Sequence, residues 1–132
     1  MVPKFRAFSI EAKTMHNVLA IDFSRNMYCL QIGKATIGEW FWFREIELMQ
    51  STGLKDKNGV EIYERDIVVN QYGNVGYVAY LQQEAGFVVV KKKSDYRLGH
   101  RNTGESYDVT TNHEVIGNIH SNPELLDKSN EN

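Results

Sequence analysis

Cysteine and proline are both scarce in this chain of 132 residues. The single cysteine, Cys29, excludes a disulfide within the chain and fits a reducing compartment. The two prolines, Pro3 and Pro123, stand near the two ends, and no linker rich in proline, serine and glycine lies between them. Because the length is also near the common size of one domain, we expect a single domain over residues 1–126.

Long apolar runs and a strong net charge are missing as well. No run approaches the roughly 18 residues that a membrane-spanning helix needs, and no apolar core of a signal peptide is present. The net charge of −2 gives no field that would draw the whole protein onto nucleic acid or anionic lipid. These absences predict a cytoplasmic protein that does not bind membranes.

The sequence also lacks the motifs of catalysis and cofactor binding. No nucleophile elbow, phosphate-binding loop, zinc-protease helix or dinucleotide fingerprint is present. Cys29 has no second cysteine at metal-ligand spacing, which favours a buried core thiol. His113 and His120 flank one expected strand on opposite faces, a poor metal geometry, and all four histidines are expected at the surface. We therefore expect no enzyme activity, no metal and no cofactor.

The clearest positive signal is a run of turns and short strands in the middle of the chain. Asn58-Gly59 tolerates the positive φ angles of a tight hairpin turn. The residues from Val60 to Tyr63 alternate between apolar and polar, and after a polar break Ile67 to Val69 is apolar throughout. This pattern predicts a hairpin with Gly59 at positive φ, followed by a short core strand.

Four carboxylates surround this hairpin. Paired carboxylates can perform acid–base chemistry or hold Mg²⁺. Those of this segment stand at turns, where an Asp side chain accepts hydrogen bonds from nearby backbone N–H groups. We therefore expect a structural role for Asp56, Glu61, Glu64 and Asp66.

The rest of the chain continues the β pattern. Strands are expected over residues 4–10, 15–23, 27–32, 75–81 and 87–90, and a one-turn helix from Asn122-Pro123 to Leu126. The prediction is a mainly β fold, a small antiparallel β-barrel or a curled sheet, with an SH3-like barrel expected for the C-terminal half. An N-terminal subdomain over residues 1–47, a barrel subdomain over 48–126 and a disordered tail over 127–132 complete this prediction.

The segment Glu39–Met49 fits neither a helix nor a strand cleanly. Read as a helix, its aromatic residues spread over two faces, and read as a strand they fall on both sides. The density of aromatic residues and the alternation in Glu45-Ile-Glu-Leu favour strand, which is our prediction.

Residues 91–108 contain almost no aliphatic side chains and are expected to form an exposed loop or a mobile hairpin. Their basic residues, with tyrosines nearby, could hold a nucleic-acid backbone. A solvated loop that protects a sheet edge is favoured, because the remainder of the chain is acidic. The candidate nucleic-acid contacts are Lys91, Lys92, Lys93, Arg97 and Arg101.

Three blocks of the sequence resemble the YopX-like proteins, a phage and prophage family of unassigned function. They are KFRAFSIEAKTM at residues 4–15, LMQSTGLKDKNGVEIYERDIV at 48–68 and EVIGNIHSNPELL at 114–126. Arg65 stands where this family is expected to have glycine, so the turn before Ile67 either does not need positive φ or tolerates strain. The resemblance implies a viral or prophage origin, with the bacterial host's cytoplasm as the location, and supplies no catalytic residues.

Together these observations favour a phage or prophage accessory protein that acts by protein–protein contact. Apolar residues on both faces of several expected strands leave surface for a partner, which predicts a homo-oligomer or a complex with an unidentified phage or host protein. The alternative function is a small β-barrel module that binds nucleic acid.

Overall fold

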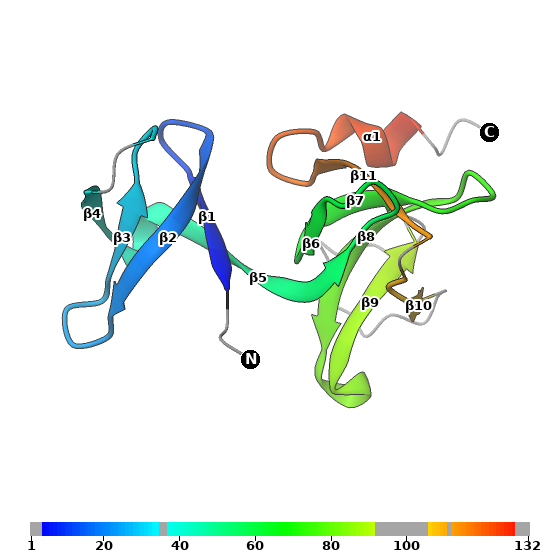
Figure 1. Ribbon diagram of the computed structural model, residues 1–132, viewed down its shortest axis with the longest axis horizontal. Helices are drawn as coiled ribbons and strands as arrows, with labels where there is room; N and C mark the ends of the chain where they lie inside the picture. The colour runs from blue at the N-terminus through cyan, green and yellow to red at the C-terminus, as the bar shows by residue number, and fades with distance from the viewer. Residues whose placement is uncertain (1–3, 35–36, 92–105, 111, 129–132) are drawn as a thin grey trace. The chain divides into compact units, whose positions relative to one another are not determined.

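The structure is a computed structural model that describes residues 4–34, 37–91, 106–110 and 112–128, and it is mainly β (Figure 1). The predicted fold class is thereby confirmed. The strands in this part of the chain are β1 (Phe5–Ser9), β2 (Thr14–Asp22), β3 (Met27–Gln31), β4 (Gly38–Trp42), β5 (Ile46–Lys55), β6 (Glu61–Tyr63), β7 (Asp66–Val69), β8 (Val75–Leu81), β9 (Gly86–Lys91), β10 (Ser106–Asp108) and β11 (Glu114–Asn118). Two 3-10 turns, η1 (Phe43–Glu45) and η2 (Gln82–Glu84), and one short helix, α1 (Glu124–Lys128), complete the described elements.

The chain divides into two compact units, Met1–Ser51 and Thr52–Asn132. The strand β5 runs through the boundary, so its first part belongs to the first unit and its last residues belong to the second. Each unit has buried apolar clusters of its own.

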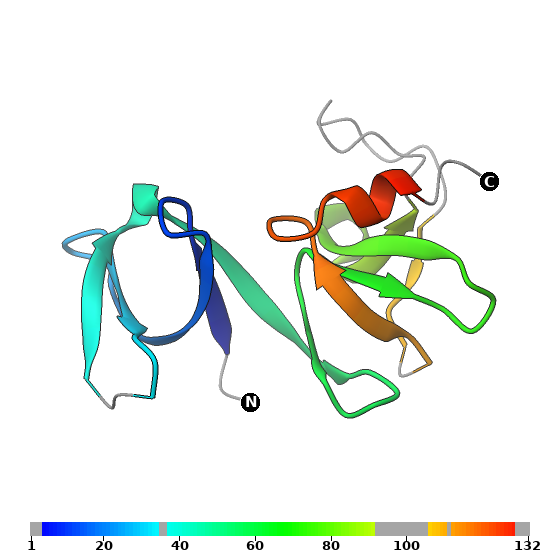
Figure 2. The same ribbon diagram turned by 90° about the horizontal axis from the view of Figure 1, so that it is seen from above.

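The sheet of the first unit has the strand order β4-β3-β2-β1-β5, with antiparallel neighbours. Figure 2 shows this sheet curled around its inner face. The curl suits a β-bulge in β2 between Val18 and Ala20, where the register with β3 shifts. The inner face holds the core cluster Ala7, Tyr28, Leu30 and Ile46.

The predicted hairpin joins β5 to β6, which is the next strand in the same sheet order. Gly59 has a φ of 83°, which confirms the predicted positive angle. The Thr52 hydroxyl donates a hydrogen bond of 2.8 Å to the carbonyl oxygen of Ile62 and ties the two strands together.

The second sheet has the order β10-β9-β8-β7-β11 and is apolar on both faces. One face carries Val68, Val78 and Val89 beneath Ile62 of β6. The other carries Ile67, Tyr77, Val88 and Val90 against Leu126 of α1, and Figure 1 shows that helix lying along the sheet. This double burial explains why Ile67 to Val69 is apolar without alternation.

The described strands form open sheets and do not close into a barrel. The second sheet has β10 at one end and β11 at the other, rather than the closed ring of an SH3-like barrel. Of the two arrangements that the sequence predicts, the curled sheet is therefore the one that the described residues form.

Two carboxylates of the hairpin region have the structural role that the sequence predicts. Asp56 accepts backbone hydrogen bonds from Asn58 and Val60 at 2.8 Å each and from Val115 of β11 at 2.9 Å. Burial raises the pKa of Asp56, but these three hydrogen bonds outweigh it and leave the pKa lowered. Asp66, which is 1% exposed, accepts a hydrogen bond of 2.8 Å from the backbone N–H of Tyr63.

Two local expectations need correction. The segment Glu39–Met49 is strand at both ends but is interrupted by η1, where the Phe43 ring stacks on Tyr28 with ring centroids 4.3 Å apart. The C-terminal helix continues to Lys128, two residues into the segment that was expected to be disordered, because Leu125 and Leu126 pack on the second core. Residues 129–132 lie outside the described part of the chain.

Candidate binding surface

The surface begins with β4, in which tryptophan and phenylalanine alternate from Trp40 to Trp42. Trp40 and Trp42 are two residues apart and therefore point to the same side of the sheet. Phe41 between them points to the other side and packs against the first core. Because the inner positions already fill that core, both indoles remain on the outer face, where they are 43% and 42% exposed.

Each of these tryptophans is covered by an arginine from a neighbouring turn. The Arg25 guanidinium lies 5.2 Å from the centre of the Trp40 ring, and the Arg44 guanidinium lies 5.2 Å from that of Trp42. Both distances are within the range of cation–π attraction. We call Arg25, Trp40, Trp42 and Arg44 the arginine–tryptophan surface.

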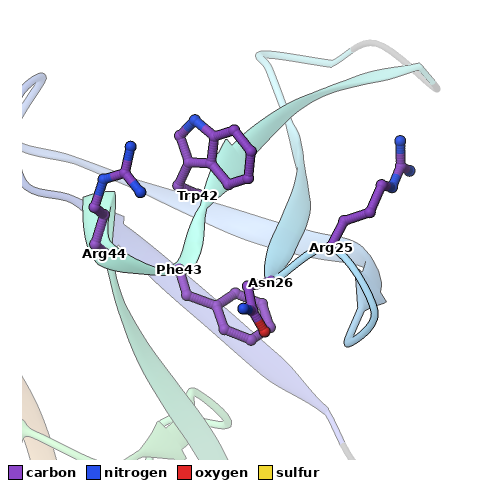
Figure 3. Close-up of a pocket in the computed structure, with 5 residues that line it drawn as sticks. All are labelled: Arg25, Asn26, Trp42, Phe43 and Arg44. Carbon is purple, nitrogen blue, oxygen red and sulfur yellow. The ribbon is translucent and has the colours of Figure 1, made fainter.

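A pocket of about 420 Å³ opens beside this surface (Figure 3). It is lined by Arg25, Asn26, Trp42, Phe43 and Arg44, so its walls carry two cations and no carboxylate. In Figure 3 the Trp42 indole and the Arg44 guanidinium lie together.

The turn between β2 and β3 fixes Arg25. The Asp22 carboxylate accepts hydrogen bonds from the Ser24 hydroxyl at 2.6 Å and from the Arg25 Nε at 2.6 Å, and two backbone N–H groups add to them. These contacts, that from Ser24 first and then that from Arg25, lower the pKa of Asp22 from 3.8 to about 2. Asn26 closes the turn with a φ of 57°, a conformation that asparagine tolerates better than most residues.

The turn η1 fixes Arg44 and Trp42. The Glu45 carboxylate accepts a hydrogen bond of 2.8 Å from the Trp42 backbone N–H. The Phe43 N–H donates to the Asn26 carbonyl at 2.9 Å, and the Ile10 N–H donates to the Glu45 carbonyl at 3.2 Å. The pocket is thus held by contacts between segments that are far apart in the sequence.

Of the candidate nucleic-acid residues of the sequence, only Lys91 belongs to an element that the structure describes. Lys91 is the last residue of β9, and Lys92, Lys93, Arg97 and Arg101 lie outside the described residues. The aromatic density of residues 40–43 predicts a strand but does not by itself indicate a binding surface. Arg44 beside Trp42 was a local signal for the surface, whereas Arg25 and Trp40 meet only through the pairing of β3 with β4.

The histidines differ partly from expectation. His113 is buried rather than exposed, because its ring turns back onto its own loop and its Nδ1 accepts a hydrogen bond of 3.2 Å from the Thr110 N–H. His16 joins two strands through its Nδ1, 3.0 Å from the Gln31 carbonyl oxygen. His100 lies outside the described residues.

Cys29 is buried, as predicted. Among the residues that the structure places, no group of three His, Cys, Asp or Glu side chains could hold a metal ion.

The fold and this surface define a mainly β protein of two units, with a cationic aromatic pocket on the first. The chain belongs to the YopX family, because the family model described as YopX protein matches residues 4–127. It is similar to protein EF1440 from Enterococcus faecalis, whose crystal structure shares 32% sequence identity with it. That similarity covers 96% of this chain and 99% of the other, with a TM-score of 0.61.

The comparison with curated proteins gave no match. No helix in the described ranges has the length and apolar character needed to cross a membrane.

Proposed function

We propose that this protein is a phage or prophage accessory protein that acts by protein–protein contact, first of all with further copies of itself, in the cytoplasm of a bacterial host. The observation that carries the proposal is the concentration of exposed large apolar side chains on the first unit. Seven of those described lie in that unit, against five in the longer second unit. Those of the first unit are Ile10, Leu19, Phe23, Ile32, Ile37, Trp40 and Trp42.

Such side chains support association because apolar area removed from water stabilises a complex. Ile37 alone is 82% exposed in the free chain. The first unit has six basic and five acidic residues, so its net charge of +1 gives little repulsion between two copies. Most soluble oligomers are symmetric assemblies of one chain, which makes a second copy the first partner to test.

We also propose that the protein catalyses no reaction. The lining of the pocket supports this proposal, because arginine, asparagine, tryptophan and phenylalanine are not the usual nucleophiles or general bases. A binding role needs only the surface chemistry that these side chains provide.

Light scattering over a range of protein concentrations tests self-association. The wild type should have a mass of at least two chains, and Ile37→Ser should shift the equilibrium toward the monomer. Tyr72→Ser is the matched control, since Tyr72 is 78% exposed on a turn of the second unit. A monomeric wild type at high concentration, together with no host or phage partner in pull-downs, would contradict the proposal.

A further inference from the structure

We propose that the arginine–tryptophan surface and its pocket bind an unpaired nucleic-acid strand. This activity goes beyond the protein contacts proposed above and shares only Trp40 and Trp42 with them, since the other five exposed apolar side chains of the first unit take no part in it. The residues that we assign to this site are not those of the basic run at residues 91–101.

The first element of the site is a pair of stacking platforms. Trp40 and Trp42 lie on one side of β4, about 6.8 Å apart along the strand. Each indole has an arginine over one face but is still 43% or 42% exposed, so bases of one strand can stack on the part of each ring that stays open to solvent. Stacking on exposed aromatic residues of a β-sheet is a general mode of binding single strands, and it tolerates sequence because every base has a π face.

The second element is the cation beside each platform. A guanidinium that stacks on an indole still presents N–H groups at its edge, and these match the oxygens of a phosphate. Arg25 forms an ion pair with Asp22, in which Nε of Arg25 lies 2.6 Å from Oδ2 of Asp22. No carboxylate in the described part of the chain pairs with Arg44, whose contact is with the Trp42 ring. Arg44 is therefore the residue that we assign to the phosphate. Arg25 should contribute less to phosphate binding, because it is already paired with Asp22.

The third element is the pocket between the two arginines. It has a volume of about 420 Å³ and is open to solvent. Asn26 on its wall carries an amide that can donate and accept hydrogen bonds, as the edge of a base requires. A base that enters the pocket would meet the amide while its phosphate meets Arg44.

This combination favours an unpaired strand over two other anionic partners. In a duplex the base faces are stacked on one another, so a row of indoles cannot reach them. An acidic peptide would pair with the arginines but would leave the exposed part of each indole without a stacking partner. A single strand uses both the aromatic and the cationic groups.

Tryptophan fluorescence gives a direct test, because Trp40 and Trp42 are the chain's only two tryptophans. The full chain is titrated at low salt with a thymidine oligonucleotide of about 12 nucleotides, a length in the range of single-strand sites. We expect saturable quenching, and an affinity that falls as salt rises. The same oligonucleotide annealed to its complement should bind much more weakly.

Substitutions inside and outside the proposed site test which residues bind the oligonucleotide. Trp42→Ala should weaken binding about tenfold or more, the usual effect of removing one stacking platform. Arg44→Ala should reduce the slope of log K against log salt by about 0.7, the value for one phosphate contact on a single strand. Tyr72→Ala is the control for an exposed aromatic residue, and a variant with alanine at Lys91, Lys92 and Lys93 should still quench. Circular dichroism of Trp42→Ala and Arg44→Ala checks that both fold.

Three outcomes would overturn the proposal. One is the absence of any change in fluorescence or oligonucleotide anisotropy at low salt. Another is binding that survives in Trp42→Ala and Arg44→Ala but is lost in the triple lysine variant. A third is quenching by a glutamate-rich peptide of equal length in preference to the oligonucleotide, which would make the surface a protein-docking site. The oligomeric state measured by light scattering is a separate readout, so this proposal and the previous one can fail independently.

Discussion

At the scale of single residues, Asp22 shows how a turn positions a functional side chain. Its charged form is favoured because it accepts hydrogen bonds from Ser24 and Arg25. The pKa of about 2 lies below the ordinary 3.8, so the stabilisation is complete above about pH 4 and is lost as the pH falls through about 2. An NMR titration of the Asp22 carboxyl should give a midpoint near pH 2.

The Ser24→Ala variant should move this midpoint up toward the ordinary value, since the largest of the favourable contacts is removed. Ser121→Ala, at an exposed serine of the second unit, should leave it in place. A wild-type midpoint near 3.8 would show that the turn does not hold Arg25 as described.

Arg65 offers a second prediction at this scale. It has a φ of 68°, where a side chain with a Cβ is strained. The backbone there is held by hydrogen bonds from its N–H to Val78 at 2.7 Å and from Ile119 to its carbonyl at 2.9 Å. Of the two possibilities that the sequence left open, the turn is therefore the one that needs positive φ and tolerates strain.

The variant Arg65→Gly should relieve that strain, which is about 1–2 kcal/mol, against a loss of about 0.5–1 kcal/mol from the greater freedom of glycine in the unfolded chain. The expected result in urea unfolding is a gain in the free energy of unfolding of between about 0 and 1.5 kcal/mol. Arg65→Ala is the matched control, because alanine removes the guanidinium but keeps the strain. A gain in the alanine variant equal to that in the glycine variant would assign the effect to the side chain instead.

At the scale of elements, the hairpin between β5 and β6 is a local unit whose turn is decided by Gly59. Its φ is 83° and no atom lies within 4 Å of where a Cβ would stand. A β-branched residue would therefore meet backbone strain alone, on the order of 1–2 kcal/mol. Gly59→Val should lower the melting temperature by several degrees.

Two comparisons make this result specific. Gly59→Asn should cost less, since asparagine tolerates this backbone region, and a polar substitution at the exposed Lys57 should have little effect. If Gly59→Val melted together with the wild type, the turn geometry described for this hairpin would be wrong.

The elements also explain which parts of the fold could be predicted from the sequence alone. The Asn58-Gly59 turn was predictable because its chemistry lies within a few residues, and Ile67 to Val69 was predictable because both faces of β7 are buried. The interruption at Phe43 was not, because its ring stacks on Tyr28, which is far away in the sequence.

The candidate surface could not be predicted from the sequence either, because it also depends on contacts between residues that are far apart in the chain. Arg25 reaches Trp40 only because β3 pairs with β4 in a register that places Cys29 opposite Trp40. The buried position of His113 likewise depends on a loop that folds back on itself. Patterns of alternation reveal which residues share a face, but they do not reveal which strands are neighbours.

At the scale of the whole molecule, the main feature is the presence of separate cores in one short chain. The cluster around Leu30 lies within the first unit, and the two clusters around Val68 and Ile67 lie within the second. Among the described residues, none of these clusters draws buried members from both units. Units with their own cores commonly unfold as separate cooperative blocks.

We therefore predict that a core substitution destabilises only the unit that contains it. Leu30→Ala and Ile67→Ala form a matched pair, since both side chains are fully buried and each loss should cost about 2–5 kcal/mol. In native-state hydrogen exchange, Leu30→Ala should reduce the protection of amides in β1 to β4 while β7 to β9 stay protected. Ile67→Ala should give the reverse pattern. Equal loss of protection in both units with either variant would mean that the chain unfolds as one block. In that case the continuous strand β5, which belongs to both units, would be the element that couples their stability.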